Sequence, residues 1–170
     1  MASQFPHITW WCPQLPPSPE AAAKLITHGT AHWPADRMAV IGSSLGGFYA
    51  TWLANQRACK AALLNPAINP ARDLTKYIGE QTVWHDPAER FYFAPQFVDE
   101  LRALEVGALP HPERIWALIA KGDEVLDWRE MTARYPGSQQ TILEGGDHAI
   151  SNFEQHLPQL LDFLDLQAAP

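Results

Sequence analysis

The sequence predicts an α/β fold, in which a mostly parallel sheet is covered by helices on both faces. Short apolar runs alternate along the chain with segments whose apolar residues recur at helical spacing. This alternation is typical of parallel sheets, whose strands are buried on both faces and read as continuous apolar runs. The chain has 170 residues, of which 46% are hydrophobic, and this is enough for one core. We therefore expect a single domain over residues 1–170.

Local signals place the strands and helices of this fold along the chain. The expected strands are the apolar runs at residues 8–11, 38–41, 61–64, 115–120 and 141–143. The expected helices are the amphipathic segments at residues 20–28, 45–56 and 152–166. Ser18 suits the N-cap of the first helix, Pro19 suits its first position, and Gly29 is expected to end it.

Residues 70–113 interrupt the alternation of strands and helices. The segment is rich in aromatic and charged residues and carries no clear strand. We expect a small helical excursion above the sheet, in the position that a lid would occupy.

Composition and charge exclude several classes of function. The formal net charge is −7 and the isoelectric point is about 5.4, so the chain repels phosphate backbones and nucleic acid is not expected as a partner. No His, Cys, Asp or Glu cluster has the spacing of metal ligands, so no metal or other cofactor is expected. Cys12 and Cys59 are interpreted as buried free thiols in a reducing compartment.

The sequence also bears on location. No apolar stretch reaches about 18 residues and the N-terminus has no basic segment, so neither a membrane span nor a signal peptide is expected. The expected location is the cytoplasm. The oligomeric state is left open, a homo-oligomer included.

The stretch from Gly42 to Gly46 reads Gly-Ser-Ser-Leu-Gly and follows an apolar run. It matches the pattern G-x-S-x-G, in which the central serine, here Ser44, lies at φ > 0 in a sharp turn between a strand and a helix. Glycine is expected on both sides because side chains there would clash as the helix folds back on the strand. The N–H of Leu45, at the start of the helix, would be an oxyanion donor. Ser43 lacks the symmetric glycines and is not the expected nucleophile.

A serine nucleophile needs a general base, and His148 is the expected one. In folds of this type the chain order is Ser, then Asp or Glu, then His. His148 follows the last strand in a glycine-rich loop, Glu-Gly-Gly-Asp-His, just before the last helix. His156 falls inside the last helix and is expected at the surface or as a cap, and His85 falls in the excursion.

Asp123 is the expected orienting carboxylate, because it follows the strand at residues 115–120. Asp127 is four residues further on, where capping a helix would explain it. Glu124 and Asp147 are weaker alternatives, Asp147 because neighbours in a loop usually point apart. In this scheme Ser44 attacks an acyl carbonyl, His148 moves the proton, and Asp123 holds the imidazole.

Five blocks of sequence resemble the YqiA-like esterases, a branch of the α/β-hydrolase superfamily. The blocks are CPQLPPSP near the start, VIGSSLGGFYATWLA, LLNPA at residues 63–67, KGDEVLDWREM and LEGGDHAISNFE. The resemblance runs over nearly the whole chain. It implies hydrolysis of carboxylic esters or thioesters without a cofactor, with Ser44, Asp123 and His148 at the matching positions.

The resemblance also reveals a departure. The family begins with a strand that ends in a His-Gly-Phe type loop, which supplies a second oxyanion N–H. Nothing here precedes the strand at residues 8–11, and His28-Gly29 is interpreted as the C-cap of a helix. We therefore expect an N-terminally shortened sheet with a gap. Either the chain is truncated, or residues 8–11 pair directly with residues 38–41, or another chain fills the gap.

Two functional expectations follow from the motifs and the gap. The first is a serine hydrolase acting on short- to medium-chain esters or thioesters, with weak turnover because one oxyanion donor is missing. Tyr77 and Trp84 of the excursion are expected to line its acyl site, while Phe48, Tyr49 and Trp52 are expected mainly in the core. The second is a catalytically impaired protein of the same fold that binds a ligand or partner. Acyl transfer or peptide cleavage by the same residues is also compatible with the sequence.

Overall fold

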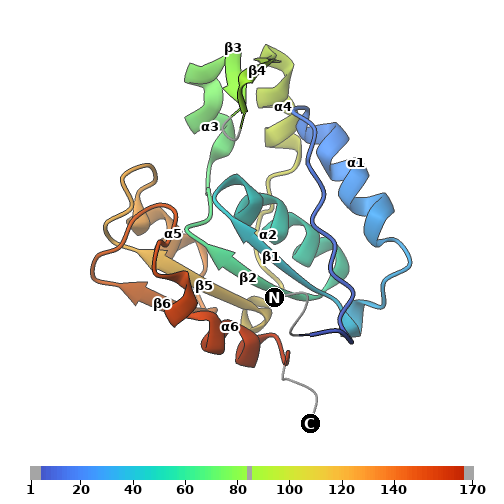
Figure 1. Cartoon of the computed structure of the whole chain (residues 1–170), viewed down its shortest axis with the longest axis vertical. Coiled ribbons are helices and arrows are strands. Elements are labelled where there is room, and N and C mark those ends of the chain that lie inside the picture. The colour runs from blue at the N-terminus through green and yellow to red at the C-terminus, as the bar shows by residue number, and fades with distance from the viewer. Residues whose placement is uncertain (1–4, 84–85, 167–170) are drawn as a thin grey trace.

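The computed structural model describes residues 5–83 and 86–166 of the chain (Figure 1). Its main sheet is parallel throughout, in the strand order β1-β2-β5-β6. The four strands are β1 (Ala39–Ser43), β2 (Lys60–Leu64), β5 (Ile115–Ala120) and β6 (Gln139–Leu143). The predicted α/β fold with a mostly parallel sheet is therefore confirmed, with its strands at four of the five expected places.

The helices pack on both faces of this sheet. They are α1 (Pro19–Thr30), α2 (Leu45–Arg57), α3 (Pro70–Leu74), α4 (Pro95–Ala103), α5 (Trp128–Arg134) and α6 (Leu157–Phe163). The described residues also form four short 3₁₀ helices: η2 (Ala35–Arg37), η3 (Thr75–Tyr77), η4 (Pro112–Arg114) and η5 (Phe153–Gln155). Among the described residues, no helix is both long and apolar enough to cross a membrane.

Alternate side chains of the central strands point into two separate cores, as expected for strands buried on both faces. Leu63, Ala117 and Ile119 face one core, which contains the buried residues of α1, α2 and α4 and Met131 of α5. Ala62, Trp116 and Leu118 face the other core, which is closed by Leu160 of α6. Phe48 and Tyr49 are buried in the first core and Trp52 packs against it, as the sequence predicted.

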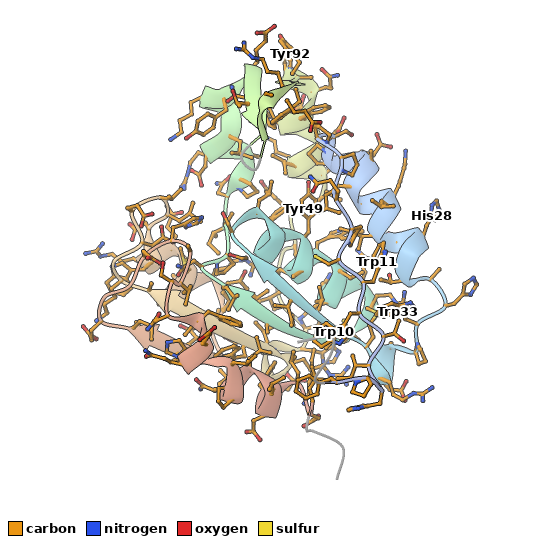
Figure 2. All side chains as sticks on the ribbon, viewed as in Figure 1. Trp10, Trp11, His28, Trp33, Tyr49 and Tyr92 are labelled. Atoms are coloured by element: carbon orange, nitrogen blue, oxygen red, sulfur yellow. The ribbon has the colours of Figure 1, made fainter. Side chains whose placement is uncertain are left out.

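The first helix begins as predicted but does not end as predicted. Ser18 is its N-cap and accepts a hydrogen bond from Ala21 N. Gly29 does not end the helix, because the helix runs on to Thr30. A Cβ at Gly29 would lie 2.2 Å from the ring of Trp11, so this glycine allows the indole to lie against the helix (Figure 2). The C-cap interpretation of His28-Gly29 is therefore wrong.

The strand expected at residues 8–11 does not form, and that expectation is wrong. The described residues before α1 contain no strand, and β1 pairs only with β2, so direct pairing of this segment with β1 is not observed. Trp11 of this segment packs on α1 instead. The neighbouring Cys12 is exposed, contrary to expectation, while Cys59 is buried.

The segment from residue 70 to 113 is partly β structure, so the expectation that it carries no strand is wrong. Strands β3 (Gly79–Val83) and β4 (Asp86–Phe93) form an antiparallel pair between α3 and α4. These four elements lie together at one end of the molecule, and α6 lies at the other end (Figure 1). Glu100 of α4 accepts hydrogen bonds from the Ser18 hydroxyl and from Glu20 N, which ties this end to the start of α1.

The helix expected over residues 152–166 is broken into η5 and α6. Pro158 explains the break, because a proline inside a helix has no N–H and its ring clashes with the carbonyl four residues earlier. The proline instead lies in the first turn of α6, where it is tolerated. The predicted apolar face remains, since Leu160 and Leu164 are buried and Phe153 packs against them.

Candidate active site

Ser44 lies in the sharp turn between β1 and α2. Its φ is 52° and its ψ is −123°, a backbone conformation that residues other than glycine rarely adopt. The positive φ predicted from the G-x-S-x-G pattern is confirmed. A strained serine at the start of a helix is held in place by the elements around it and presents its hydroxyl above the sheet edge.

The glycines of this turn differ in what they do. A Cβ at Gly42 would lie 2.1 Å from the carbonyl oxygen of Gly46, so no side chain fits there. A Cβ at Gly46 itself would meet nothing within 4 Å, so the expected clash at that position is wrong. The second crowded position is Gly47, where a Cβ would lie 2.7 Å from Cβ of Pro66.

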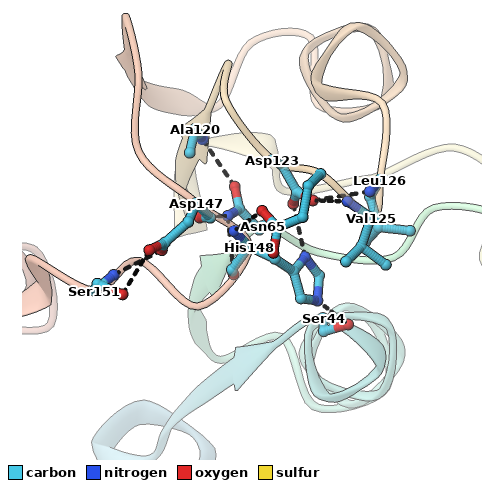
Figure 3. A network of polar contacts seen from close by, with 10 residues as sticks. Ser44, Asn65, Ala120, Asp123, Val125, Leu126, Asp147, His148 and Ser151 are labelled. Carbon is cyan, nitrogen blue, oxygen red and sulfur yellow. Dashed lines mark hydrogen bonds and ion pairs between the residues drawn. The ribbon is translucent and has the colours of Figure 1, made fainter.

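The structure brings Ser44, His148 and Asp123 into one hydrogen-bonded line (Figure 3). The Ser44 Oγ and His148 Nε2 are 2.9 Å apart. The His148 Nδ1 and Asp123 Oδ2 are 2.8 Å apart. Because a carboxylate can only accept, Nδ1 carries the imidazole proton and Nε2 is free to accept the serine proton.

Burial and further hydrogen bonds hold this line in place. The Asp123 side chain has no exposed surface, and that of His148 is 21% exposed. Asp123 Oδ1 accepts from Val125 N and Leu126 N, both at 2.8 Å. The carboxylate thus has three donors, which compensate for its burial and fix its orientation.

The alternative carboxylates have other partners. Asp127 caps α5 by accepting from Arg129 N. Asp147 accepts from Ser151 N and from the Ser151 hydroxyl, and this hydroxyl lowers the pKa of Asp147 below its usual value. Neither of these side chains bonds the His148 ring.

Two contacts between the loops around Asp123 and His148 were not expected from the sequence. Glu124 accepts from His148 N at 2.9 Å. A Cβ at Gly122 would lie 2.2 Å from the carbonyl oxygen of Gly146, so the two loops touch where neither has a side chain. The glycine-rich composition of both loops could have suggested this close approach.

Asn65 is a third residue that the sequence reasoning did not assign. It is completely buried at the end of β2, and its side chain hydrogen-bonds to both of these loops (Figure 3). The LLNPA block was the only signal for it in the sequence, and nothing in the block gives the amide a role.

The expected oxyanion donor, Leu45, is the first residue of α2, directly after Ser44. N–H groups in the first turn of a helix have no intrahelical acceptor and carry the positive end of the helix dipole. The position of Leu45 N–H is therefore compatible with binding an anion beside Ser44.

The residues expected to line an acyl site are not placed beside Ser44. Tyr77 ends η3, is 44% exposed, and lies under the ammonium of Lys76. Within the described chain it makes no polar or ring contact with Ser44, Asp123 or His148. Trp84 lies outside the described residues.

A cavity of about 220 Å³ lies between α2 and the end of α5. Its lining comes from α2, from the segment after β2, from the segment after α4 and from the end of α5: Phe48, Thr51, Ala67, Ile68, Asn69, Glu105, Val106, Arg134 and Tyr135. Neither Ser44 nor His148 is among these residues.

The other histidines and cysteines among the described residues form no comparable arrangement, and His85 lies outside those residues. His156 stands at the N-cap position of α6 without a capping bond, and its Nε2 is buried with no partner in the described structure. Burial raises the pKa of the Cys59 thiol. No group of three or more potential metal ligands occurs in the part of the chain that the structure describes.

The fold places the chain in a broad class of known structures. It superimposes on a hydrolase of Agrobacterium vitis S4 with a TM-score of 0.68 and 16% identity, over 86% of this chain and 69% of the other. The mouse protein called alpha/beta hydrolase domain-containing protein 10 superimposes with a TM-score of 0.61 and 19% identity, over 87% of this chain and 70% of the mouse chain. A monoacylglycerol lipase of Paleococcus ferrophilus superimposes with a TM-score of 0.56 and 18% identity, over 88% of this chain and 76% of the lipase chain. The chain thus has an α/β-hydrolase fold.

The sequence itself assigns the family. Residues 1–165 match the family described as Uncharacterised protein family (UPF0227), and the chain belongs to this family.

Proposed function

We propose that the chain is a serine hydrolase that cleaves short- to medium-chain carboxylic esters or thioesters through an acyl-enzyme. The observation that supports this is the line of contacts from Ser44 Oγ to His148 Nε2 at 2.9 Å and from His148 Nδ1 to Asp123 at 2.8 Å. The strained position of Ser44 before a helix adds support, because it exposes the hydroxyl to a substrate. The resemblance to YqiA-like esterases agrees with it.

In the first half of the reaction Ser44 is acylated. Its Oγ attacks the acyl carbonyl carbon while His148 Nε2 takes the hydroxyl proton, which forms a tetrahedral intermediate. Breaking the carbon–oxygen or carbon–sulfur bond releases the alcohol or thiol, which receives the proton from Nε2. Asp123 holds the imidazole in the correct tautomer and stabilises its charged form.

In the second half water replaces the alcohol. His148 takes a proton from the water, the hydroxide attacks the acyl carbon, and collapse of the intermediate returns the proton to Ser44 Oγ and releases the acid. The N–H of Leu45 would stabilise the oxyanion in both halves. Removing one oxyanion donor usually lowers turnover about 10²–10³-fold, so we expect weak turnover if no second donor approaches Ser44.

The aromatic residues Tyr77 and Trp84 remain our proposal for the acyl site, and the excursion that carries them remains our proposal for a lid. The proposed partner is a small acyl ester or thioester and the proposed location is the cytoplasm. Nucleic acid and membranes are not proposed as partners.

Hydrolysis of p-nitrophenyl butyrate by the wild type and by Ser44→Ala tests the proposal. We expect release of p-nitrophenol by the wild type and a rate at the level of the buffer for the variant. A Ser43→Ala variant is the control, because Ser43 is the exposed neighbour and has no part in the mechanism. Equal rates for the wild type and Ser44→Ala would refute the proposal.

The second candidate function is a catalytically impaired protein that binds a ligand or a partner. It is favoured by the outer edge of β1, which pairs with no strand among the described residues, and by Ile41 on that strand, which is 37% exposed. Absence of hydrolysis by the folded wild type would favour this function over the first.

A further inference from the structure

Asn65 stands where β2 ends and is a completely buried polar residue. Its φ is 39°, in the left-handed region that asparagine tolerates better than most residues. Its backbone N–H donates to Leu118 O at 3.0 Å, which continues the ladder between β2 and β5 by one residue.

The side-chain amide of Asn65 bonds three backbone groups, one at the end of β5 and two on the loop of His148. Its Oδ1 accepts from Ala120 N at 2.8 Å. Its Nδ2 donates to Asp147 O at 3.0 Å and to His148 O at 3.1 Å. Ala120 ends β5, three residues before Asp123, so one amide joins the loop of the carboxylate to the loop of the imidazole.

Only an amide of this size can make these contacts. Both N–H groups of Nδ2 face carbonyl oxygens, and Oδ1 faces an N–H. An aspartate would keep the bond from Ala120 N but turn an oxygen toward two carbonyl oxygens. A serine is too short to span from Ala120 to His148, and an apolar residue would leave the buried Ala120 N without a partner and remove the donor to the His148 carbonyl. The Asp147 carbonyl would keep its bond from Ile150 N.

The other links between these loops are weaker constraints on His148. Backbone bonds from Lys121 N to Leu143 O and from Gly122 N to Gly145 O hold the start of the second loop but do not reach His148. Glu124 bonds His148 N but is exposed, so water can replace it. The contact of Gly122 with Gly146 limits how far apart the loops lie but does not fix rotation about them. The Asn65 amide is buried and holds His148 through its own carbonyl.

We propose that Asn65 is a positioning residue that keeps the His148 imidazole aligned between Asp123 and Ser44. The expected effect on turnover rests on the proposed function. The expected effect on the alignment of the His148 ring does not. Without the two Nδ2 bonds, the His148 carbonyl loses its anchor to the end of β2, and we expect the His148 end of the loop to shift relative to β5. A shift of about 1 Å can lower turnover about 10²-fold.

The test uses Asn65→Asp and Asn65→Gly in the full chain. The aspartate keeps the size and the bond to Ala120 and removes both donors. The glycine takes the φ of 39° without strain and removes all three bonds. Thr141→Val is the matched control, since Thr141 Oγ1 accepts from Trp116 and Gln159 and so joins β6 to β5 and α6 away from the site.

Two readouts are needed. One is kcat and KM for p-nitrophenyl butyrate, and the other is the downfield proton NMR signal of His148 Nδ1–H bonded to a carboxylate. For both Asn65 variants we expect kcat to fall about 10–100-fold with KM changed less than about threefold, and the signal to broaden or vanish. Thr141→Val should change kcat less than about threefold and keep the signal.

Each other outcome decides the question. A folded Asn65→Asp with wild-type kcat and wild-type signal overturns the proposal. If both variants fail to fold while Thr141→Val folds, Asn65 is needed for the fold itself and the positioning role is also overturned. If the wild type does not hydrolyse the ester, the proposed function fails, while the Nδ1 signal in the variants still tests the role of Asn65.

Discussion

At the scale of single residues, the turn around Ser44 depends on which glycines face a neighbour. Gly42 faces the backbone of Gly46 at a distance that excludes a Cβ, while the Cβ position of Gly46 is open. Of the two glycines in the pattern G-x-S-x-G, only Gly42 is therefore required by the space around it. Gly47 rather than Gly46 supplies the second close approach, to Pro66.

This asymmetry predicts opposite outcomes for two similar substitutions. Gly42→Ala should destabilise the protein by about 3 kcal/mol or more, because the new methyl group meets backbone that cannot move aside. Gly46→Ala should be neutral or stabilising by up to about 1 kcal/mol, because alanine favours the helix. Urea unfolding of both variants measures this, and a larger loss for Gly46→Ala would contradict the structure.

Which residues meet at the candidate site was the part that could be predicted best. Ser44, Asp123 and His148 were selected by residue type and by their positions after strands, and the structure places all three within hydrogen-bonding reach. Asn65 could not be predicted in this way, because its role depends on residues far from it in the sequence. Ala120 lies 55 positions from Asn65 and His148 lies 83 positions from it. Tyr77 was chosen on residue type alone, and no described contact brings it to Ser44.

At the scale of elements, an ion pair joins α3 to α5. The Arg72 guanidinium donates to both carboxylate oxygens of Glu130 at 2.8 Å and also to Asp73. The hydrogen bonds from Arg72 hold the pKa of Glu130 below its usual value. The Glu130 side chain is 40% exposed, so solvent screening keeps the contribution of this pair to stability small, at about 1 kcal/mol or less.

The pair predicts a pH-dependent effect of Glu130→Gln. Because the pKa of Glu130 is lower in the folded state, its carboxylate stabilises the fold at pH values above its unfolded pKa of about 4.3. This stabilisation is lost as the pH falls through the folded pKa. The variant should therefore be less stable than the wild type at pH 7, and the difference should shrink below about pH 4. Urea unfolding at both pH values checks this, with the exposed Glu154→Gln as control. A difference that does not change with pH would contradict it.

Helices and strands with strong local signals were predicted correctly. The last helix was predicted too long because Pro158 was overlooked, and elements that depend on distant contacts were not predicted. The strand at Ile115–Ala120 and the capped start of α1 agree with the sequence, since apolar runs and Ser18-Pro19 act locally. The β3–β4 pair was missed because its strands are mostly polar, and only Phe91 and Phe93 at the end of β4 reach the first core. Residues 8–11 had the apolar run but no partner strand, and a run alone does not form a strand.

At the scale of the whole molecule, two cores lie on opposite faces of a four-stranded sheet, with β1 at its edge. The central strands are shielded on both faces, while β1 leaves Ile41 37% exposed. The layers could be predicted from the alternation of runs and helices. The strand order could not, because it leaves no local trace in the sequence. The gap beside β1 was expected from the family resemblance and not from a local pattern.

The open edge predicts unequal costs for two truncations. Leu118→Ala, in the centre of the sheet and fully buried, should cost about 2–5 kcal/mol. Ile41→Ala should cost at most about half as much, because part of its side chain stays in water. Urea unfolding of the two variants measures this. An equal or larger loss at Ile41 would mean that this edge is covered in solution by chain or partner.

The most direct test of the account is covalent labelling of the whole protein with a fluorophosphonate, read by intact mass and peptide mapping. An ordinary serine does not react, whereas a serine activated by a histidine does. We predict one adduct on Ser44 that is retained in Ser43→Ala and absent from Ser44→Ala and His148→Ala. No adduct on the folded wild type, or an adduct on any residue other than Ser44, would contradict the assignment of Ser44 as the nucleophile.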